Sequence, residues 1–318
     1  MPIAPLPAPA PGPPPGDADG LLPATQGRSG RLVHAVPGLV RWPNLAIMLL
    51  SLVLVRVLLL PEQPLRAVLL APRFGLLVLA ALAVAAAGYI INDYYDVKID
   101  AINRPARLVV GRLLSRRHAM LAHLVLSGAG VVLAVGLSGR LGAVTLGAAL
   151  LLWGYSARFK RLPLVGNISI ATLTGALILL PALLPAPTPD GRLKAVWLYA
   201  LAAFLLTAVR EIVKDLEDMR GDAQHGCRTL PLVWGVARSK WVAGFFLLCL
   251  WALVLGVSGQ LLAWGRWLLV VWLLALVLLP LGWLAHLLLR ADRRRHFRQL
   301  SAWCKAIMLA GVLSMMLV

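Results

Sequence analysis

Two acidic segments of the chain have the same spacing of carboxylates, with Asp at positions i, i+3 and i+7 of each. On an α-helix these three positions lie on one face, so each segment would present three carboxylates together. Eight of the thirteen Asp and Glu residues of the chain lie in these two regions. Like charges so close to one another repel, and they need a cation between them. The two segments are Asn92-Asp93-x-x-Asp96-x-x-x-Asp100 and Asp215-x-x-Asp218-x-x-x-Asp222.

The chemistry that these residues suit is the binding of a divalent cation. Carboxylate and amide oxygens are hard ligands, and Mg²⁺ is commonly shared between protein carboxylates and the phosphates of a substrate. A charged group at membrane depth costs about 2.5–3.5 kcal/mol on insertion scales, so two copies of a three-acid pattern indicate a function. A solvated loop remains the alternative for any single Asp. We therefore predict one Mg²⁺ site with catalytic carboxylates, formed by Asn92, Asp93, Asp96, Asp100, Asp215, Asp218 and Asp222.

Basic residues accompany both acidic segments. A diphosphate that binds Mg²⁺ needs further cations on the side that the metal does not cover. Acids and bases at one face of an apolar helical bundle favour a ligand with an anionic head and an apolar tail, and an isoprenyl diphosphate has both. The cations expected to bind it are Lys98, Arg104, Arg107, Lys160, Lys214 and Arg228.

Other polar residues near the expected helix ends have two interpretations, and both stay open. Arg41 and Asn44 either reach the ligand or only anchor the start of the first helix. Asn167 either lines the ligand cavity or makes a hydrogen bond at a helix end. Three tyrosines either stabilise a developing cation through their ring faces or anchor the chain at the membrane interface. These tyrosines are Tyr94, Tyr95 and Tyr155.

The composition is that of a polytopic membrane protein. The 318 residues are 60% hydrophobic and only 14% charged, and the mean hydropathy is +0.83, whereas a soluble protein of this size needs more polar surface. The net charge of +18 comes from short basic segments between apolar runs, so no nucleic-acid partner is expected. The three cysteines lack metal-ligand spacing and the six histidines are scattered, which argues against a disulfide framework and a histidine metal site.

The apolar runs predict an all-α fold with nine transmembrane helices in one membrane domain, residues 37–318. Each run is long enough to cross about 30 Å of hydrocarbon. Residues 1–36 are rich in Pro, Ala and Gly and are predicted to be a disordered tail. Because the acidic segments end the second and the sixth helices, helices 2–5 and 6–9 are predicted to be related halves. The runs cover about 42–60, 73–92, 116–138, 141–157, 165–185, 194–215, 239–258, 265–288 and 300–317.

The distribution of basic residues predicts the orientation in the membrane. Of the 31 Lys and Arg residues, 23 fall on the side that holds the N-terminus and both acidic segments. By the positive-inside rule this side faces the cytoplasm, and the C-terminus lies on the other side of the cell (inner) membrane.

The motifs resemble those of the UbiA superfamily of intramembrane prenyltransferases, over essentially everything after residue 36. The first acidic segment is similar to the N-D-x-x-D-x-x-x-D motif on helix 2 of the family, and Arg104 and Arg107 match its basic continuation. The second segment is similar to the motif on helix 6. Tyr155 and Lys160 resemble the Tyr and Lys pair after helix 4, although the spacing here is one residue longer, which leaves Arg158 as the alternative to Lys160.

The resemblance implies nine transmembrane helices around a central cavity, with a cap of cytoplasmic loops over the site. It implies Mg²⁺-dependent transfer of a prenyl group, expected to be geranylgeranyl, from an allylic diphosphate to a lipophilic acceptor. Within the superfamily, residues 92–100, 163–167 and 210–218 are most similar to the digeranylgeranylglyceryl phosphate synthases. That narrower resemblance implies geranylgeranylglyceryl phosphate as the acceptor and ether lipid synthesis as the pathway.

Two other functions remain as alternatives. One is an aromatic prenyltransferase of quinone biosynthesis, because a hydroxybenzoate or naphthoate acceptor also carries an anion. The basic group Arg158, Lys160 and Arg161 would suit a second phosphate, or it only follows the positive-inside rule. The other alternative is a cation transporter, which explains intramembrane acids. A transporter would place its acids near the middle of the bilayer, whereas these acids are expected at helix ends beside Lys and Arg.

Overall fold

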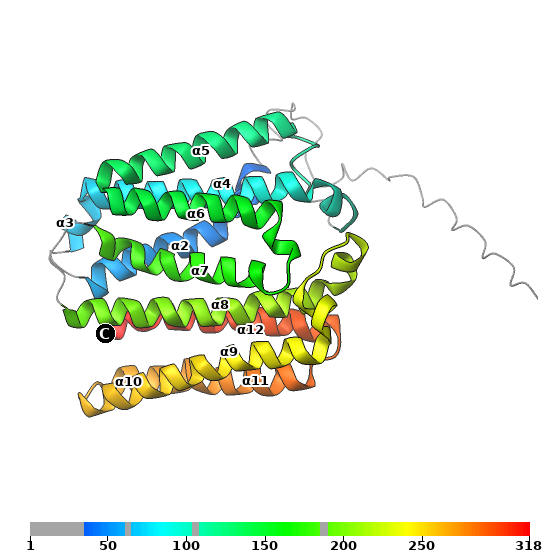
Figure 1. The fold of residues 1–318 in the computed structure, drawn as a ribbon. Coiled ribbons are helices and arrows are strands. Elements are labelled where there is room, and N and C mark those ends of the chain that lie inside the picture. The colour runs from blue at the N-terminus through cyan, green and yellow to red at the C-terminus, as the bar shows by residue number, and fades with distance from the viewer. Residues whose placement is uncertain (1–34, 61–64, 104–107, 185–189) are drawn as a thin grey trace, which may run out of the picture.

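The computed structural model describes residues 35–60, 65–103, 108–184 and 190–318, and within these ranges the chain is helical without a β-strand. The helices lie roughly parallel or antiparallel to one another in a single bundle (Figure 1). This confirms the all-α, polytopic architecture. The predicted tail, residues 1–36, lies almost wholly outside the described residues.

The apolar runs of the sequence each form a helix or a short succession of helical segments. The bounds are α2 Trp42–Leu54 with η2 Val55–Leu59, α3 Leu65–Leu70, α4 Pro72–Asn103, α5 Arg116–Leu137, α6 Gly139–Ala157, η4 Phe159–Arg161, α7 Val165–Leu179 with η5 Leu180–Leu183, α8 Asp190–Gln224, α9 Leu230–Ala263, α10 Trp267–Leu273 with η6 Leu274–Leu278 and α11 Leu279–Arg290, and α12 Arg294–Leu313 with η7 Ser314–Leu317.

The two helices that carry the acidic segments continue well beyond the apolar runs that predict them. The runs expected at 73–92 and 194–215 extend to Asn103 in α4 and to Gln224 in α8. An apolar run shows only the part of a helix that is buried in the membrane, and these helices continue beyond it as polar helix. Both acidic segments therefore lie within helices, which fixes each set of carboxylates on a helical face.

Eight helices of the described chain are long and apolar enough to cross a membrane. The fourth expected run forms α6, but this helix is not one of the eight. Four glycines together with Arg140 and Thr145 lower its apolar content. The helix still packs against α4, α5 and α7 within the bundle. A count of nine crossing helices thus stays a prediction, whereas an integral, multi-pass membrane protein is established.

The buried core is divided between the two parts of the bundle. One large cluster of buried apolar side chains comes from α8 to α12, and it includes Val209, Ile212, Leu250 and Leu284. Three smaller clusters come mainly from α2 to α8, with one further contribution from Met315.

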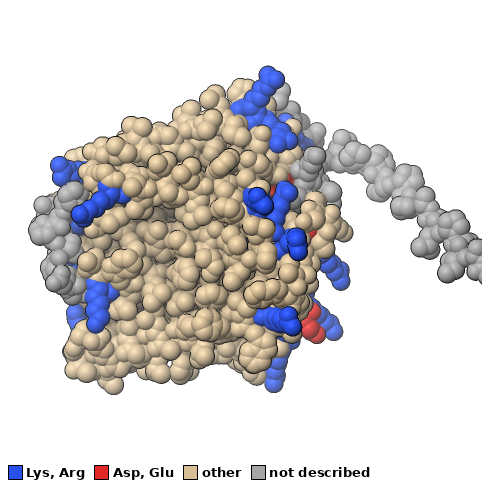
Figure 2. All heavy atoms as spheres, in the orientation of Figure 1, with Lys and Arg blue, Asp and Glu red and all other residues tan. Residues whose placement is uncertain are grey.

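Charged side chains are concentrated at the two ends of the bundle, and the surface between the ends is an almost uncharged band in Figure 2. The acidic side chains visible in this view lie at one end, among Lys and Arg. That end contains the C-terminal parts of α4 and α8 and the start of α12 (Figure 1). An uncharged band between charged ends is the surface that a bilayer requires.

Candidate active site

One large cavity occupies the centre of the bundle, with a volume of about 1490 Å³. Its wall is made by α2, α4, α6, α7, α8, α9, α10, η6 and α12, and most of it is apolar. Both acidic segments border this cavity, although they are about 120 residues apart in the chain. The predicted site residues that line it are Arg41, Asn44, Asn92, Asp93, Asp96, Tyr155, Lys160, Lys214, Asp215, Asp218 and Asp222.

The first acidic segment is held by a lysine from the loop after α6. The Lys160 Nζ donates to Asp96 Oδ1 at 2.5 Å and to Asn92 Oδ1 at 3.4 Å. The Asn92 amide in turn donates from Nδ2 to Asp96 Oδ2 at 3.0 Å. The lysine and Asp96 side chains are both mostly buried, so their charges are weakly screened. Lys160, and not Arg158, therefore lies beside the carboxylates, because Arg158 does not line the cavity.

Arg41 reaches the same segment from the residue before α2. Its Nη2 lies 3.3 Å from Asp93 Oδ1, and its guanidinium lies over the Tyr89 ring, 5.0 Å from the ring centroid. The backbone of Arg41 has a φ of 52°, a left-handed conformation that is unfavourable for a residue with a Cβ. Strained backbone of this kind persists where its surroundings require it, and here it directs Arg41 to the site. Asn44 lies in the next turn and lines the cavity.

The second acidic segment has a partner for each of its three carboxylates. The Asn167 amide of α7 donates from Nδ2 to Asp215 Oδ2 at 2.8 Å. The Arg294 guanidinium, at the start of α12, lies 3.6 Å from Asp218. The Thr229 hydroxyl, just before α9, donates to Asp222 at 3.3 Å. Asn167 is itself buried and does not line the cavity, so its contact orients Asp215.

The loop that carries Lys160 is packed tightly against the start of α7. A Cβ at Gly166 would lie 2.9 Å from the Lys160 Cα and 3.0 Å from the Phe159 carbonyl oxygen. A contact below 3.0 Å is essentially never seen for a real Cβ, so a larger residue would have to displace the backbone here and glycine permits the close approach. Leu164, the residue before α7, has a φ of 64°, the only other positive φ among the described non-glycine residues besides that of Arg41. Arg41 lines the cavity beside Asp93, and Leu164 precedes the helix whose Asn167 donates to Asp215.

The carboxylates fit a divalent cation only if a ligand completes its coordination. No three His, Cys, Asp or Glu side chains of the described residues converge closely enough to hold a metal by themselves. Hard oxygen donors on opposite walls of one cavity instead suit Mg²⁺ that is bound through one or two carboxylates and the oxygens of a phosphate ligand. The chemistry of this donor set agrees with the sequence-based prediction of Mg²⁺.

Some predicted residues are not placed at the site by the structure. Lys98 and Asp100 belong to α4, but their side chains are not described, and Arg104 and Arg107 lie outside the described residues. Arg228 does not line the cavity, and its backbone N–H donates to the Arg161 carbonyl oxygen at 2.9 Å. Their roles stay predictions. The described rings of Tyr94 and Tyr95 pack edge to face with centroids 5.3 Å apart and do not line the cavity, whereas Tyr155 does.

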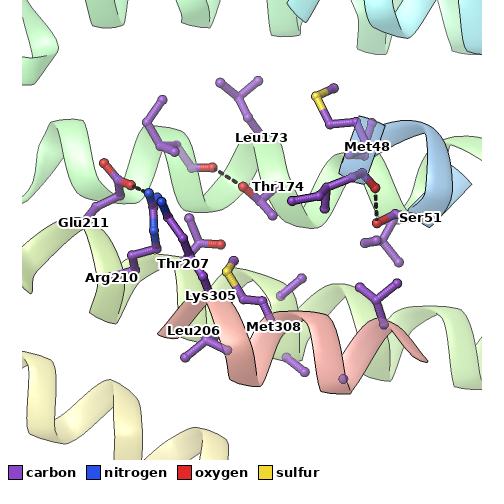
Figure 3. A pocket seen from close by; sticks show the side chains of 18 of the residues that line it. Met48, Ser51, Leu173, Thr174, Leu206, Thr207, Arg210, Glu211, Lys305 and Met308 are labelled. Atoms are coloured by element: carbon purple, nitrogen blue, oxygen red, sulfur yellow. Dashed lines mark hydrogen bonds and ion pairs between the residues drawn. The ribbon is translucent and has the colours of Figure 1, made fainter. Parts of the chain in front are cut away.

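A second group of charged residues, not predicted as a site from the sequence, lies further along the cavity. Arg210 and Glu211 of α8 and Lys305 of α12 all line it. Figure 3 shows Lys305 extending from α12 toward the Arg210–Glu211 pair. A charged residue within an apolar helix is the signal that could have identified Lys305, because such residues are rare and face a cavity or a partner.

The fold and the site define a class of protein: a helical, multi-pass membrane protein with a large, mostly apolar cavity that ends in two facing sets of carboxylates. Residues 63–308 match the UbiA prenyltransferase family, and the chain belongs to that family.

Curated relatives match about half of the chain. The digeranylgeranylglyceryl phosphate synthase of Methanopyrus kandleri is 40% identical over 173 residues, which are 54% of this chain and 61% of the relative. The synthase of Thermococcus sibiricus is 38% identical over 159 residues, which are 50% of this chain and 55% of the relative. The chain thus spans less than two thirds of the length of these relatives.

Solved structures share the fold over almost the whole chain. A digeranylgeranylglyceryl phosphate synthase structure has a TM-score of 0.69 at 22% identity and covers 91% of this chain and 100% of its own. A UbiA homologue from Archaeoglobus fulgidus bound to GPP and Mg²⁺ has a TM-score of 0.60 at 17% identity. The match covers 89% of this chain and 99% of the homologue. At these identities the likeness establishes the fold.

Proposed function

We propose that this protein is a Mg²⁺-dependent prenyltransferase that transfers a prenyl group from an allylic diphosphate to a lipophilic acceptor. The observation that carries the proposal is that both acidic segments border one end of the same apolar cavity. Carboxylates with cationic partners suit a diphosphate and its Mg²⁺, and the apolar remainder suits the prenyl chain. A family relative of the same fold is bound to GPP and Mg²⁺, which supports this assignment.

In the proposed reaction, the chain's own residues position the donor and stabilise the charge that develops on its diphosphate. When bound, Mg²⁺ would neutralise part of that charge. Lys160 and Arg41 lie beside the carboxylates and would bind diphosphate oxygens directly. The allylic C–O bond breaks and its electrons stay with the diphosphate. A bond then forms between prenyl C1 and the acceptor oxygen, and the hydroxyl proton passes to the departing diphosphate.

The Tyr155 side chain is placed where it could act on the reacting carbon. It lines the cavity between the two acidic segments, close enough to Glu211, Asp215 and Asp96 for their charges to interact with its hydroxyl. A ring face at this position would stabilise positive charge on the allylic group. We propose this role for Tyr155 and not for Tyr94 or Tyr95.

The proposed acceptor is geranylgeranylglyceryl phosphate, and the proposed donor is geranylgeranyl diphosphate. The curated relatives at 38–40% identity are synthases named for the product of this transfer, which supports the choice. A cavity of about 1490 Å³ provides room for two prenyl chains. The competing acceptor is an aromatic carboxylate such as 4-hydroxybenzoate.

The test is product analysis with the purified protein, Mg²⁺ and geranylgeranyl diphosphate. Geranylgeranylglyceryl phosphate and 4-hydroxybenzoate are offered together, and products are identified by mass spectrometry. We expect the di-ether lipid as the main product and no turnover in excess chelator. A prenylated benzoate as the main product would overturn the acceptor, and the absence of any prenyl product would overturn the proposed function.

The proposed orientation places the acidic end of the cavity on the cytoplasmic side. The positive-inside rule supports this, because the acidic end carries most of the Lys and Arg residues. In a variant with its native cysteines replaced, a cysteine at the exposed Asp292 should react with an impermeant thiol reagent only from the cytoplasmic side. A cysteine at the exposed Gly139, the first residue of α6, should react only from outside, and the reverse pattern would contradict the orientation.

A further inference from the structure

The middle of the cavity holds more positive than negative charge. The buried carboxylate of Glu211 accepts from Arg210 Nη1 at 2.7 Å and from Lys214 Nζ at 2.8 Å. Lys305 faces the same group from α12 and forms no ion pair with any described residue, although it is close enough for its charge to interact with those of Arg210, Lys214 and Glu211. Three cations therefore surround one carboxylate.

Two neighbouring carboxylates do not remove this excess. Glu217 pairs with Arg298 at 3.1 Å, and Asp215, whose hydrogen-bond partner is the neutral Asn167 amide, keeps its charge for the proposed Mg²⁺ site. Arg41, the other cation near Glu211, pairs with Asp93. An excess of cations in an apolar, weakly screening environment is unfavourable unless an anion binds there.

Two buried polar atoms at the same place have no hydrogen-bond partner among the described residues. They are the Nε of Arg210 and the hydroxyl of Thr207, whose residue is only 2% exposed. Thr207 and Arg210 are three residues apart on α8 and so share a face, and both line the cavity. Figure 3 shows both side chains beside Lys305. Buried polar atoms almost always have a partner, so these donors point to a ligand with several acceptor oxygens.

We propose that Thr207, Arg210 and Lys305 form the binding site for the acceptor's phosphate group, separate from the diphosphate site at the acidic end. This inference rests on the proposed prenyl transfer and deepens it. A phosphate monoester carries nearly two negative charges at pH 7 and has three strong acceptor oxygens. It therefore matches both the charge excess and the unpartnered donors, whereas the single charge of a benzoate would leave one cation unmatched.

The position of this site suits an acceptor that must face the donor. Arg210 precedes Asp215 by five residues and Asp218 by eight, which is roughly 7.5–12 Å along α8 at 1.5 Å per residue. Phosphate bound at Arg210 would leave the short glycerol unit to span the distance toward the reacting carbon. On α12, Ser301, Lys305, Met308 and Val312 line the cavity at helical spacing, so the apolar residues after Lys305 would contact the acceptor's own prenyl chain.

The test compares acceptors with and without the phosphate in variants of the full chain. With geranylgeranylglyceryl phosphate, Lys305→Gln and Thr207→Val should raise the acceptor KM about tenfold and leave the donor KM unchanged, a change of about 1.4 kcal/mol. With geranylgeranylglycerol, which lacks the phosphate, the same variants should differ from wild type by less than about twofold. Lys305→Arg should restore most of the loss, and Lys240→Gln, on the surface outside the cavity, is the matched control.

Equal losses with both acceptors, or no loss with either, would overturn the proposal. Equilibrium binding of labelled geranylgeranylglyceryl phosphate without donor makes the test independent of turnover. Binding that is weakened about tenfold by Lys305→Gln would support the phosphate site even if no prenyl product formed. The absence of a prenyl product would then contradict only the proposed function. Binding that is unchanged in both variants would refute the phosphate site.

Discussion

The acidic end of the cavity and its middle are opposite in charge. At the acidic end, Asp93, Asp96 and Asp218 each contact one cationic side chain. In the middle, Arg210 and Lys214 both pair with Glu211, and Lys305 adds a third positive charge beside them. The same apolar cavity therefore offers two sites at two levels. The acidic end suits Mg²⁺ with a diphosphate, and the middle suits a second anion. A protein that joins two anionic lipids needs both, because two anions at one level would repel each other.

The two levels also differ in how they are built. The acidic end is assembled from widely separated segments, with strained backbone at Arg41 and Leu164 and a glycine-dependent contact at Gly166. The middle is built mainly from one face of α8 with a single lysine from α12. We infer that the geometry of the acidic end is the more demanding, as expected for the place where charge develops during the reaction.

The largest effects should follow from neutral substitutions at the acidic end. We expect Asp96→Asn and Asp218→Asn each to lower kcat/KM by about 10²-fold or more, because each removes a charge that would hold Mg²⁺ and the diphosphate. Steady-state kinetics with geranylgeranyl diphosphate measures this, and circular dichroism checks that the helices are retained. Near-wild-type turnover in both variants would contradict the assignment of Mg²⁺ and the diphosphate to the acidic end.

An intermediate effect should follow from disturbing Lys160 through its neighbour. Gly166→Ala would push the backbone of Lys160 away from Asp96, since the added Cβ lies within 3.0 Å of two backbone atoms. We expect about a tenfold loss of kcat/KM and a loss of stability of about 1–3 kcal/mol.

The matched control for that substitution is Gly147→Ala on α6, where an added Cβ meets no atom within 4 Å. This change should leave kcat/KM unaltered and stability unchanged or slightly higher, because alanine is the better helix former. If Gly166→Ala behaved in the same way, the tight packing under Lys160 would have no role in the site.

Much of this architecture could be predicted from the sequence. The apolar runs located the helices, and the repeated Asp spacing located the acidic end, because both patterns depend only on local helical geometry. The lengths of α4 and α8 were underestimated, since polar helix beyond the membrane has no apolar signal. The partners of the carboxylates, such as Asn167 for Asp215 and Arg294 for Asp218, could not be predicted, because they depend on how distant helices pack.

The middle of the cavity was missed for a similar reason. Lys305 is one charge in an apolar helix, and its meaning appears only when α12 packs against the face of α8 that carries Thr207 and Arg210. The basic group Arg158, Lys160 and Arg161, for which the sequence left open either a second phosphate or the positive-inside rule, contributes only Lys160 to the cavity. The number of basic residues in a loop does not show which of their side chains line the cavity.

The smallest effect should be a gain in stability in the middle of the cavity. The buried Thr207 hydroxyl has no hydrogen-bond partner among the described residues, so Thr207→Val should stabilise the fold by up to about 1 kcal/mol. Thermal unfolding in detergent would show a small rise in Tm without ligand. A clear fall in Tm would mean that the hydroxyl has a structural partner, and the contrast between a satisfied acidic end and an unsatisfied middle would be weakened.

The most direct test of the two-level cavity is equilibrium binding of geranylgeranyl diphosphate in the absence of any acceptor. We predict that binding requires Mg²⁺, that it is lost in Asp96→Asn and Asp218→Asn, and that it is unchanged in Lys305→Gln. Donor binding that persists in excess chelator, or that depends on Lys305 as much as on the aspartates, would contradict the assignment of the diphosphate to the acidic end.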